Sequence, residues 1–210
     1  MSKRSLICAV TFGLFAGLVL PSSGSAATTK FIQELDFVFT PDPVTVHIGD
    51  TMTWRNQVKN LHTTTDLSPL LLWDSGLMSQ GATYSYTVTA AGTYPYFCQL
   101  HERFGMYGTF QASDFATPRM GPVGTLFTVE VATVPAPTDF IYDIQKRDPA
   151  GGFASWISTP DGSVIFDSTG QPPGIYQFRS RQRRLSDGSV GKYSPPIAIL
   201  VQSTQPPAAA

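Results

Sequence analysis

The chain has 210 residues, of which 42% are hydrophobic and 14% charged, so it holds enough apolar material for one large domain or two small ones. A formal net charge of −1 gives no indication of nucleic acid or an anionic membrane surface as a partner. Seventeen prolines, eighteen glycines and 12% aromatic residues favour short strands and tight turns over long helices.

The N-terminal segment has the pattern of an export signal. Lys3 and Arg4 precede an apolar run from Leu6 to Leu20, and small residues around Ala26 offer a cleavage site. At 15 residues the run is shorter than the roughly 18–20 needed to cross a bilayer, so a membrane anchor is the less favoured alternative. We therefore expect residues 1–27 to be a cleaved signal peptide. The mature chain is then expected to have no membrane span and to lie in the periplasm or outside the cell.

Cleavage would leave an unpaired thiol. Cys8 would leave with the signal, together with two positive charges, so the mature chain would carry a charge of −3 and a single cysteine, Cys98. A lone thiol in an oxidising compartment is buried and inert, paired between chains, or bound to a metal.

The first half of the mature chain alternates with the period of two residues that is typical of strands. This alternation predicts seven or eight strands between residues 28 and 113, the number found in a Greek-key sandwich. Four sets of residues are each expected to share one face of their own strand: Leu35, Phe37 and Phe39; Val44, Val46 and Ile48, opposite Thr45 and His47; Tyr84, Tyr86 and Val88; and Tyr94, Tyr96 and Cys98.

A small, polar, proline-containing segment, residues 114–122, is the expected linker, and alternation then resumes over residues 123–203. Strands are predicted at 126–131, 140–145, 153–157, 163–166, 175–181 and 197–201, separated by Pro- and Gly-rich turns. The Pro- and Ala-rich tail, 204–210, is expected to be disordered. The predicted class is all-β, with two Greek-key β-sandwiches in tandem.

One short segment carries metal-ligating residue types. Cys98 ends a predicted strand, His101 follows three residues later, and Met106 lies five further on. A thiolate, two imidazoles and a weak axial thioether form a type-1 (blue) copper site. The second imidazole would come from His47, which alternates outward on a strand, or from His62 in a polar loop, which is the better candidate. Zinc would accept the thiolate and imidazoles but gains little from a thioether.

Residues 35–112 resemble the plastocyanin-type cupredoxins. The matching residues are Pro43-Val44-Thr45-Val46, Gly49-Asp50, Trp54-Arg55-Asn56, His62, Asp74-Ser75-Gly76, Gly92-Thr93-Tyr94, Tyr96, Cys98, His101, Gly105-Met106 and Gly108. The resemblance implies a Greek-key sandwich with one copper ion bound by His62, Cys98, His101 and Met106. Two departures, Thr63 for a frequent asparagine and Leu100 for a frequent proline, affect the potential and the rigidity of the loop rather than copper binding.

The same resemblance implies an electron carrier rather than an enzyme. Phe97 and Gln99 flank Cys98, whereas multicopper oxidases place a histidine there, and four ligands leave no open position for a substrate. We expect a monomer that exchanges single electrons with a redox partner protein through the edge of His101. A copper-buffering or copper-delivering protein is the alternative, and a metal-free adhesive or structural module is the third hypothesis.

Leu70-Leu71-Leu72 cannot all face inward if the segment is extended. One or two of these leucines could join an apolar docking patch near the copper end, in which case Leu71→Asp would slow electron exchange. Packing of this loop against the core is the favoured alternative.

Residues 118–203 resemble, more weakly, a fibronectin type III domain. The resemblance rests on residues 140–146, Trp156, the segment 173–181 and Tyr193-Ser194-Pro195, and it implies a buried Tyr176 whose hydroxyl binds an upstream loop. Four arginines, Arg179, Arg181, Arg183 and Arg184, predict a solvated basic strand face, with contact to an acidic partner as the alternative. We expect a spacer or docking role.

Overall fold

The computed structural model describes residues 26–203, and over this range the regular structure consists of β-strands and one short 3-10 helix, η1 (Glu102–Phe104). The predicted all-β class is therefore confirmed. Residues 1–25, which hold nearly all of the predicted signal peptide, and the predicted disordered tail, 204–210, lie outside the described residues. Between residues 26 and 203, no helix has the length and apolar character needed to cross a membrane.

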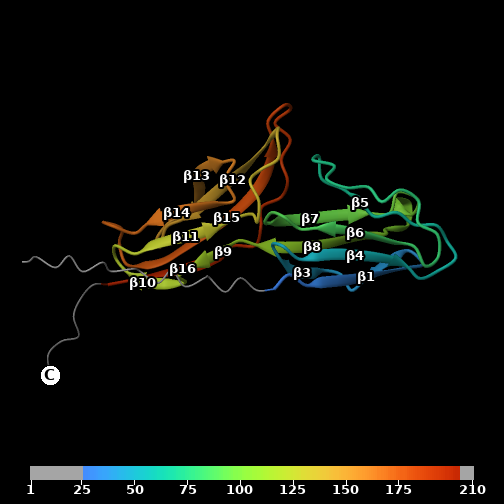
Figure 1. The fold of residues 1–210 in the computed structure, drawn as a ribbon, viewed down its shortest axis with the longest axis horizontal. Helices are drawn as coiled ribbons and strands as arrows, with labels where there is room; N and C mark the ends of the chain where they lie inside the picture. The colour runs from blue at the N-terminus through green and yellow to red at the C-terminus, as the bar shows by residue number, and fades with distance from the viewer. Residues whose placement is uncertain (1–25, 204–210) are drawn as a thin grey trace, which may run out of the picture.

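The first unit is built from eight strands in two sheets (Figure 1). One sheet has the order β2-β1-β4-β6 and the other β3-β8-β7-β5, with parallel pairing of β1 to β4 and of β3 to β8. This agrees with the seven or eight strands predicted. Their bounds are β1 (Thr29–Leu35), β2 (Val38–Thr40), β3 (Val44–His47), β4 (Thr51–Asn56), β5 (Thr65–Asp66), β6 (Thr83–Thr87), β7 (Gly92–Phe97) and β8 (Tyr107–Ser113).

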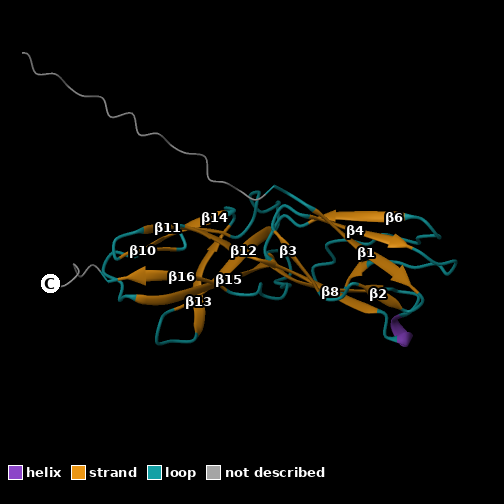
Figure 2. Cartoon of the chain, turned by 90° about the horizontal axis from the view of Figure 1, so that it is seen from below, coloured by secondary structure: helices purple, strands orange, loops and turns teal. Residues whose placement is uncertain are grey.

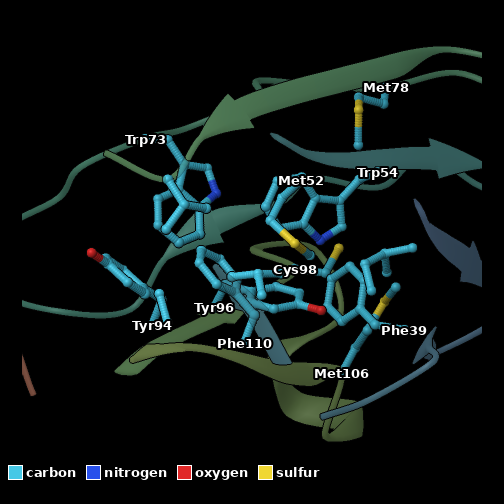
Figure 3. Close-up of a cluster of buried hydrophobic side chains, with 14 residues drawn as sticks. Phe39, Met52, Trp54, Trp73, Met78, Tyr94, Tyr96, Cys98, Met106 and Phe110 are labelled. Carbon is cyan, nitrogen blue, oxygen red and sulfur yellow. The ribbon is translucent and has the colours of Figure 1, made fainter. Parts of the chain in front are cut away.

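An aromatic core fills the space between these sheets (Figure 3). Trp54 is fully buried, with its ring 5.3 Å from that of Tyr96 and 5.8 Å from that of Trp73. Tyr94, Tyr96 and Cys98 all face inward, as their alternation predicts. Because large aromatic side chains bury more apolar surface than other residues, this cluster supplies much of the stability of the first unit.

The alternation predicted for Leu35, Phe37 and Phe39 is wrong. β1 ends at Leu35, a turn follows, and Phe37 lies in it with a φ of 61° and 43% of its surface exposed. The inward residues of β1 are Ile32 and Glu34, because the parallel register with β4 places them beside Trp54 and Asn56.

Glu34 is an unusual member of this core. Its side chain is fully buried, and neither carboxylate oxygen has a hydrogen-bond partner among residues 26–203. Burial raises the pKa of Glu34 to about 8, because the ionised form would lose its hydration without gaining a partner. The carboxyl group is therefore neutral at physiological pH.

The second unit contains a five-stranded sheet, β10-β16-β15-β12-β13, and a three-stranded sheet, β14-β11-β9. A second apolar cluster, which includes Phe127, Tyr142 and Phe178, separates the two sheets. Each strand predicted between residues 126 and 201 is present, some extended at the ends. The bounds are β9 (Phe115–Thr117), β10 (Met120–Pro122), β11 (Leu126–Glu130), β12 (Phe140–Arg147), β13 (Phe153–Thr159), β14 (Ser163–Asp167), β15 (Gly174–Arg184) and β16 (Ile197–Gln202).

The segment predicted as a linker, 114–122, is structured. It forms β9, which pairs with β11, and β10, which pairs in parallel with β16. Its small and polar residues suggested a loop, but two short edge strands accept them because each is paired on one side only. Asp114, at the start of this segment, is buried and accepts hydrogen bonds from the hydroxyls of Ser180 and Ser194. Burial raises the pKa of Asp114 to about 7.

The two units are joined by backbone hydrogen bonds. Ala91 N–H donates to the Val131 carbonyl at 2.8 Å, and Thr93 N–H donates to the Lys192 carbonyl at 3.2 Å. Figures 1 and 2 both show the second unit beyond one end of the first, whereas η1 lies at the other end. The end of the first unit that carries η1 is therefore free of the second unit.

The hypothesis that Leu70, Leu71 or Leu72 joins a patch near the copper end is wrong. Leu70 is buried, its carbonyl accepts a hydrogen bond from Arg184, and its side chain lies against Gly191. The loop therefore packs between the two units through Leu70, and Leu71, the next residue, is 71% exposed. Leu70 instead packs inside the protein, in line with the favoured alternative that this loop is packed rather than free at the surface.

Candidate metal centre

Three side chains that could bind a metal meet at the η1 end of the first unit. Among residues 26–203, His62, Cys98 and His101 form a group whose ligand atoms all lie within 4.8 Å of one another. The Cys98 Sγ is 3.8 Å from the Nδ1 of His62 and 3.4 Å from the Nδ1 of His101, and the two Nδ1 atoms are 3.2 Å apart. Both imidazoles thus present the same ring nitrogen to the thiol.

The size of this triangle suits a metal ion. A point equidistant from the three atoms lies about 2 Å from each, close to the lengths of metal–nitrogen and metal–sulfur bonds in proteins. One thiolate and two imidazoles in a plane are the equatorial donors of a type-1 copper site. The donor set and its spacing therefore fit copper.

His62 is fixed by the loop that follows β4. Its backbone N–H and carbonyl both pair with Met78, at 3.2 and 2.9 Å, and the Asn56 side chain bonds to the carbonyls of Asn60 and Met78. The ring is fully buried. Burial and, secondarily, the neighbouring His101 lower the pKa of His62, which keeps the imidazole neutral, as a metal ligand must be.

The loop from β7 to β8 places the other donors. His101 N–H donates to the Cys98 carbonyl at 3.1 Å, and Cys98 N–H donates to the Met106 carbonyl at 3.1 Å, so the loop closes on itself. Gly105 ends η1 with a φ of 79°, a conformation that glycine adopts readily. Met106 is fully buried, and Figure 3 shows it on the same side of the cluster as Cys98, next to Phe39.

Thr63 connects the two ligand loops. Its N–H donates to Cys98 Sγ at 3.3 Å, and its hydroxyl oxygen accepts a hydrogen bond from Gln99 N–H at 2.9 Å. The sequence showed Thr63 only as a departure from asparagine; its position beside His62 was the available signal for this role. Hydrogen bonds to a ligand sulfur tune the potential of a copper centre.

Two aromatic side chains cover the outer side of His101, and sequence analysis missed both. The ring of Phe37 meets His101 edge to face at 5.0 Å and packs on Phe104 at 4.7 Å. His101 is partly exposed, whereas His62 is fully buried. Nothing in the sequence signals this contact, because Phe37 reaches His101 only through the turn after β1.

The remaining histidine lies outside the site. His47 is exposed on β3 and its Nδ1 is 3.6 Å from a carboxylate oxygen of Asp50, as expected for a surface histidine. The structure therefore brings together three of the four predicted ligands as one group, with Met106 at the same end of the core.

Comparison with known proteins agrees with this geometry. Residues 26–113 match the family model of copper binding proteins, plastocyanin/azurin family. The chain is 34% identical over 103 residues to chloroplastic plastocyanin of Tetradesmus obliquus (44% of this chain, 71% of that protein) and 37% identical over 81 residues to plastocyanin of Scenedesmus fuscus (34% and 83%). A solved structure of an oxidized amicyanin mutant is 27% identical, covering 39% of this chain and 79% of its own, with a TM-score of 0.36.

The sandwich and its His-Cys-His group define a copper protein of the cupredoxin class. The chain belongs to the plastocyanin/azurin family, and its cofactor is copper.

Proposed function

We propose that this protein carries single electrons through one type-1 copper ion held by His62, Cys98 and His101, with Met106 as the weak axial ligand. The observation that carries the proposal is the convergence of the thiol and two Nδ1 atoms at one end of the first unit. Bound copper supplies a one-electron Cu(II)/Cu(I) couple, and the mixture of soft sulfur and imidazole donors suits both states.

The residues around the ligands support repeated cycling. Hydrogen bonds from Met78, Thr63 and the β7–β8 loop hold the donors in place, so little rearrangement accompanies a change of oxidation state. Electrons would enter and leave at His101, which is partly exposed, lies against Phe37 and Phe104, and follows Leu100 in the chain. The side chains of Phe37, Phe104 and Leu100 are 43%, 52% and 45% exposed and form an apolar surface for a redox partner protein.

Leu100→Asp is expected to slow electron self-exchange of the copper-loaded protein by about tenfold or more, because a carboxylate at the contact must lose hydration and repels its copy. Line broadening in NMR spectra of mixed oxidation states measures the rate. Leu71→Asp is the matched control, since Leu71 is exposed and follows Leu70, which contacts Arg184 and Gly191 of the second unit. Equal rates in the two variants would contradict electron transfer through the His101 surface.

Catalysis is not part of the proposal. Phe97 and Gln99 flank Cys98, and the sequence has only three histidines, of which two lie in the site and His47 points into solvent on β3. These residues provide neither a second copper centre nor an open coordination position.

Copper buffering or delivery uses the same four ligands and is the second candidate. Reversible voltammetry with fast self-exchange supports the carrier. Transfer of Cu(I) to an acceptor chelator at a rate that competes with electron exchange would instead support delivery.

The proposal extends to the organisation of the chain. We place a cupredoxin domain at residues 28–113. The fibronectin type III-like domain was predicted at 123–203, and we extend it to 114–203 because β9 and β10 pair with strands of the second unit. The three-plus-five arrangement of strands and the Tyr176 hydroxyl, which donates to the Pro172 carbonyl at 2.8 Å, support the second assignment. The charged and apolar pattern of residues 1–27 supports export to the periplasm or medium, and we propose that the mature protein is a monomer.

A further inference from the structure

The outer face of β15 carries an ordered row of arginines. Arg179, Arg181 and Arg183 alternate along the strand and point away from the apolar core of the second unit. Tyr193, from the segment that crosses this face, lies under two of them, with its ring 4.7 Å from the Arg179 guanidinium and 4.6 Å from that of Arg181. The stacking fixes the guanidinium planes.

Two of the three arginines have hydrogen-bond partners. Arg179 donates from Nε to the Gln145 side chain at 2.9 Å and also stacks on Phe153 at 4.2 Å. Arg183 forms a bidentate pair with Asp143, at 2.8 and 2.9 Å, and the Ser158 hydroxyl donates to the same carboxylate at 2.7 Å. The Arg183 pair and the Ser158 hydroxyl lower the pKa of Asp143, although burial opposes this, so the carboxylate is ionised.

Arg181 is held differently. Its Nε is 3.5 Å from a carboxylate oxygen of Asp143 and has no hydrogen-bond partner among the residues from 26 to 203, although the atom is buried. A buried N–H without a hydrogen-bond acceptor is costly, and only the ion pair with Asp143 offsets this at Nε. The Arg181 side chain as a whole is 26% exposed, so it can be reached by an anion from solution.

A hollow of about 300 Å³ opens beside this guanidinium. Its lining includes Asp143, Ser155, Trp156, Ser158, Arg181 and Tyr193. A β-bulge shapes it: Gln145 pairs with Ser155 and Ile144 with Ile157, so Trp156 has no partner on β12. The hollow is therefore a local deformation of the sheet placed directly beside Arg181.

We propose that this hollow binds a carboxylate group. Three guanidinium groups face one carboxylate on this surface, so an added anion is favoured, and the planar fork of an arginine matches a carboxylate with two parallel hydrogen bonds. The Ser155 hydroxyl, also in the lining, is a further donor. The carboxylate comes from an acidic side chain of a protein partner or from a small free acid, and the site is independent of the copper centre.

The test uses the full chain in its reduced, copper-loaded form, which is diamagnetic, at 150 mM salt. The amide signals of residues 155–158 are followed by NMR during titration with a capped tetraglutamate peptide, a capped tetraglutamine peptide, succinate and inorganic phosphate. The variants are Arg181→Gln, Arg181→Lys and, as a control with the same loss of charge at an exposed site, Arg119→Gln.

We expect a carboxylate ligand to shift these signals in the unmodified protein and in Arg119→Gln. Arg181→Gln should weaken binding at least tenfold, and Arg181→Lys severalfold, because lysine keeps the charge but loses the fork. Stronger binding of tetraglutamate identifies a protein partner as the source, and stronger binding of succinate identifies a small acid. Equal effects of Arg181→Gln and Arg119→Gln, tighter binding of phosphate than of either carboxylate, or no binding of any carboxylate would overturn the proposal.

Discussion

The Cys98→Ser variant is expected to lose the blue colour of the copper-loaded protein completely and to bind copper more than about 100-fold less tightly. The colour of a type-1 centre depends on the copper–thiolate bond, and a hydroxyl is a poor substitute for a soft ligand. Removal of supporting hydrogen bonds around a metal already costs 10–100-fold in affinity, so loss of a ligand costs more. Visible absorption and a competitive copper titration measure both effects.

A pair of histidine variants serves as the control for this prediction. His62→Ala removes a proposed equatorial ligand, whose Nδ1 is 3.8 Å from the Cys98 sulfur, whereas His47→Ala changes an exposed histidine on β3. The first should lose the type-1 spectrum and the second should keep it. A blue Cys98→Ser protein, or a colourless His47→Ala protein, would contradict the assignment of the ligands.

The second large effect concerns Glu34. Its pKa is about 8 in the folded protein and near 4.5 in the unfolded chain, so the folded state holds the proton more tightly. Stability is therefore unaffected by this group below pH 4.5, falls as the pH rises from 4.5 to 8, and stays reduced above that. Each pH unit in this window costs about 1.4 kcal/mol, which amounts to a few kcal/mol in total.

Glu34→Gln should remove this loss, because a neutral amide has no ionised form to bury. At pH 9 the variant should be more stable than the unmodified protein by a few kcal/mol, and near pH 4.5 this advantage should vanish. Urea unfolding of both proteins in the same metal state measures the difference at each pH. Asp114, whose pKa is raised to about 7, destabilises both proteins equally in this range, so its contribution cancels.

Glu130→Gln is the matched control, since Glu130 is a partly exposed carboxylate on β11. It should leave the pH dependence unchanged. If Glu34→Gln follows the same stability curve as the unmodified protein from pH 4.5 to 9, then the carboxyl group is not buried as described.

Two of the proposed copper ligands were predictable because their signals are local. Cys98 and His101 are three residues apart at the end of a strand, so they remain neighbours in any fold of that loop. His62 is 36 residues from Cys98; its position in a polar loop favoured it over His47, and the resemblance to the cupredoxins then implied the same residue. The structure adds the long-range hydrogen bonds that bring the loops together, such as Thr63 N–H to Cys98 Sγ.

The errors arose where non-local pairing decides which side of a strand faces inward. Alternation alone placed Phe37 on one face with Leu35 and Phe39. The parallel register of β1 with β4 instead buries Glu34, and a turn exposes Phe37. A one-residue change in register moves a whole strand to the other face, and no single-strand pattern specifies it. Likewise, the edge strands β9 and β10 form only because β11 and β16 offer them free edges.

The most direct test of the copper centre is to add one equivalent of Cu(II) to the metal-free protein and record its visible absorption and EPR spectra. Stoichiometric binding with an intense blue band and narrow copper hyperfine splitting is the predicted result. A colourless protein that keeps its Cys98 thiol free in the presence of copper would show that the two Nδ1 atoms and the sulfur do not form the site described.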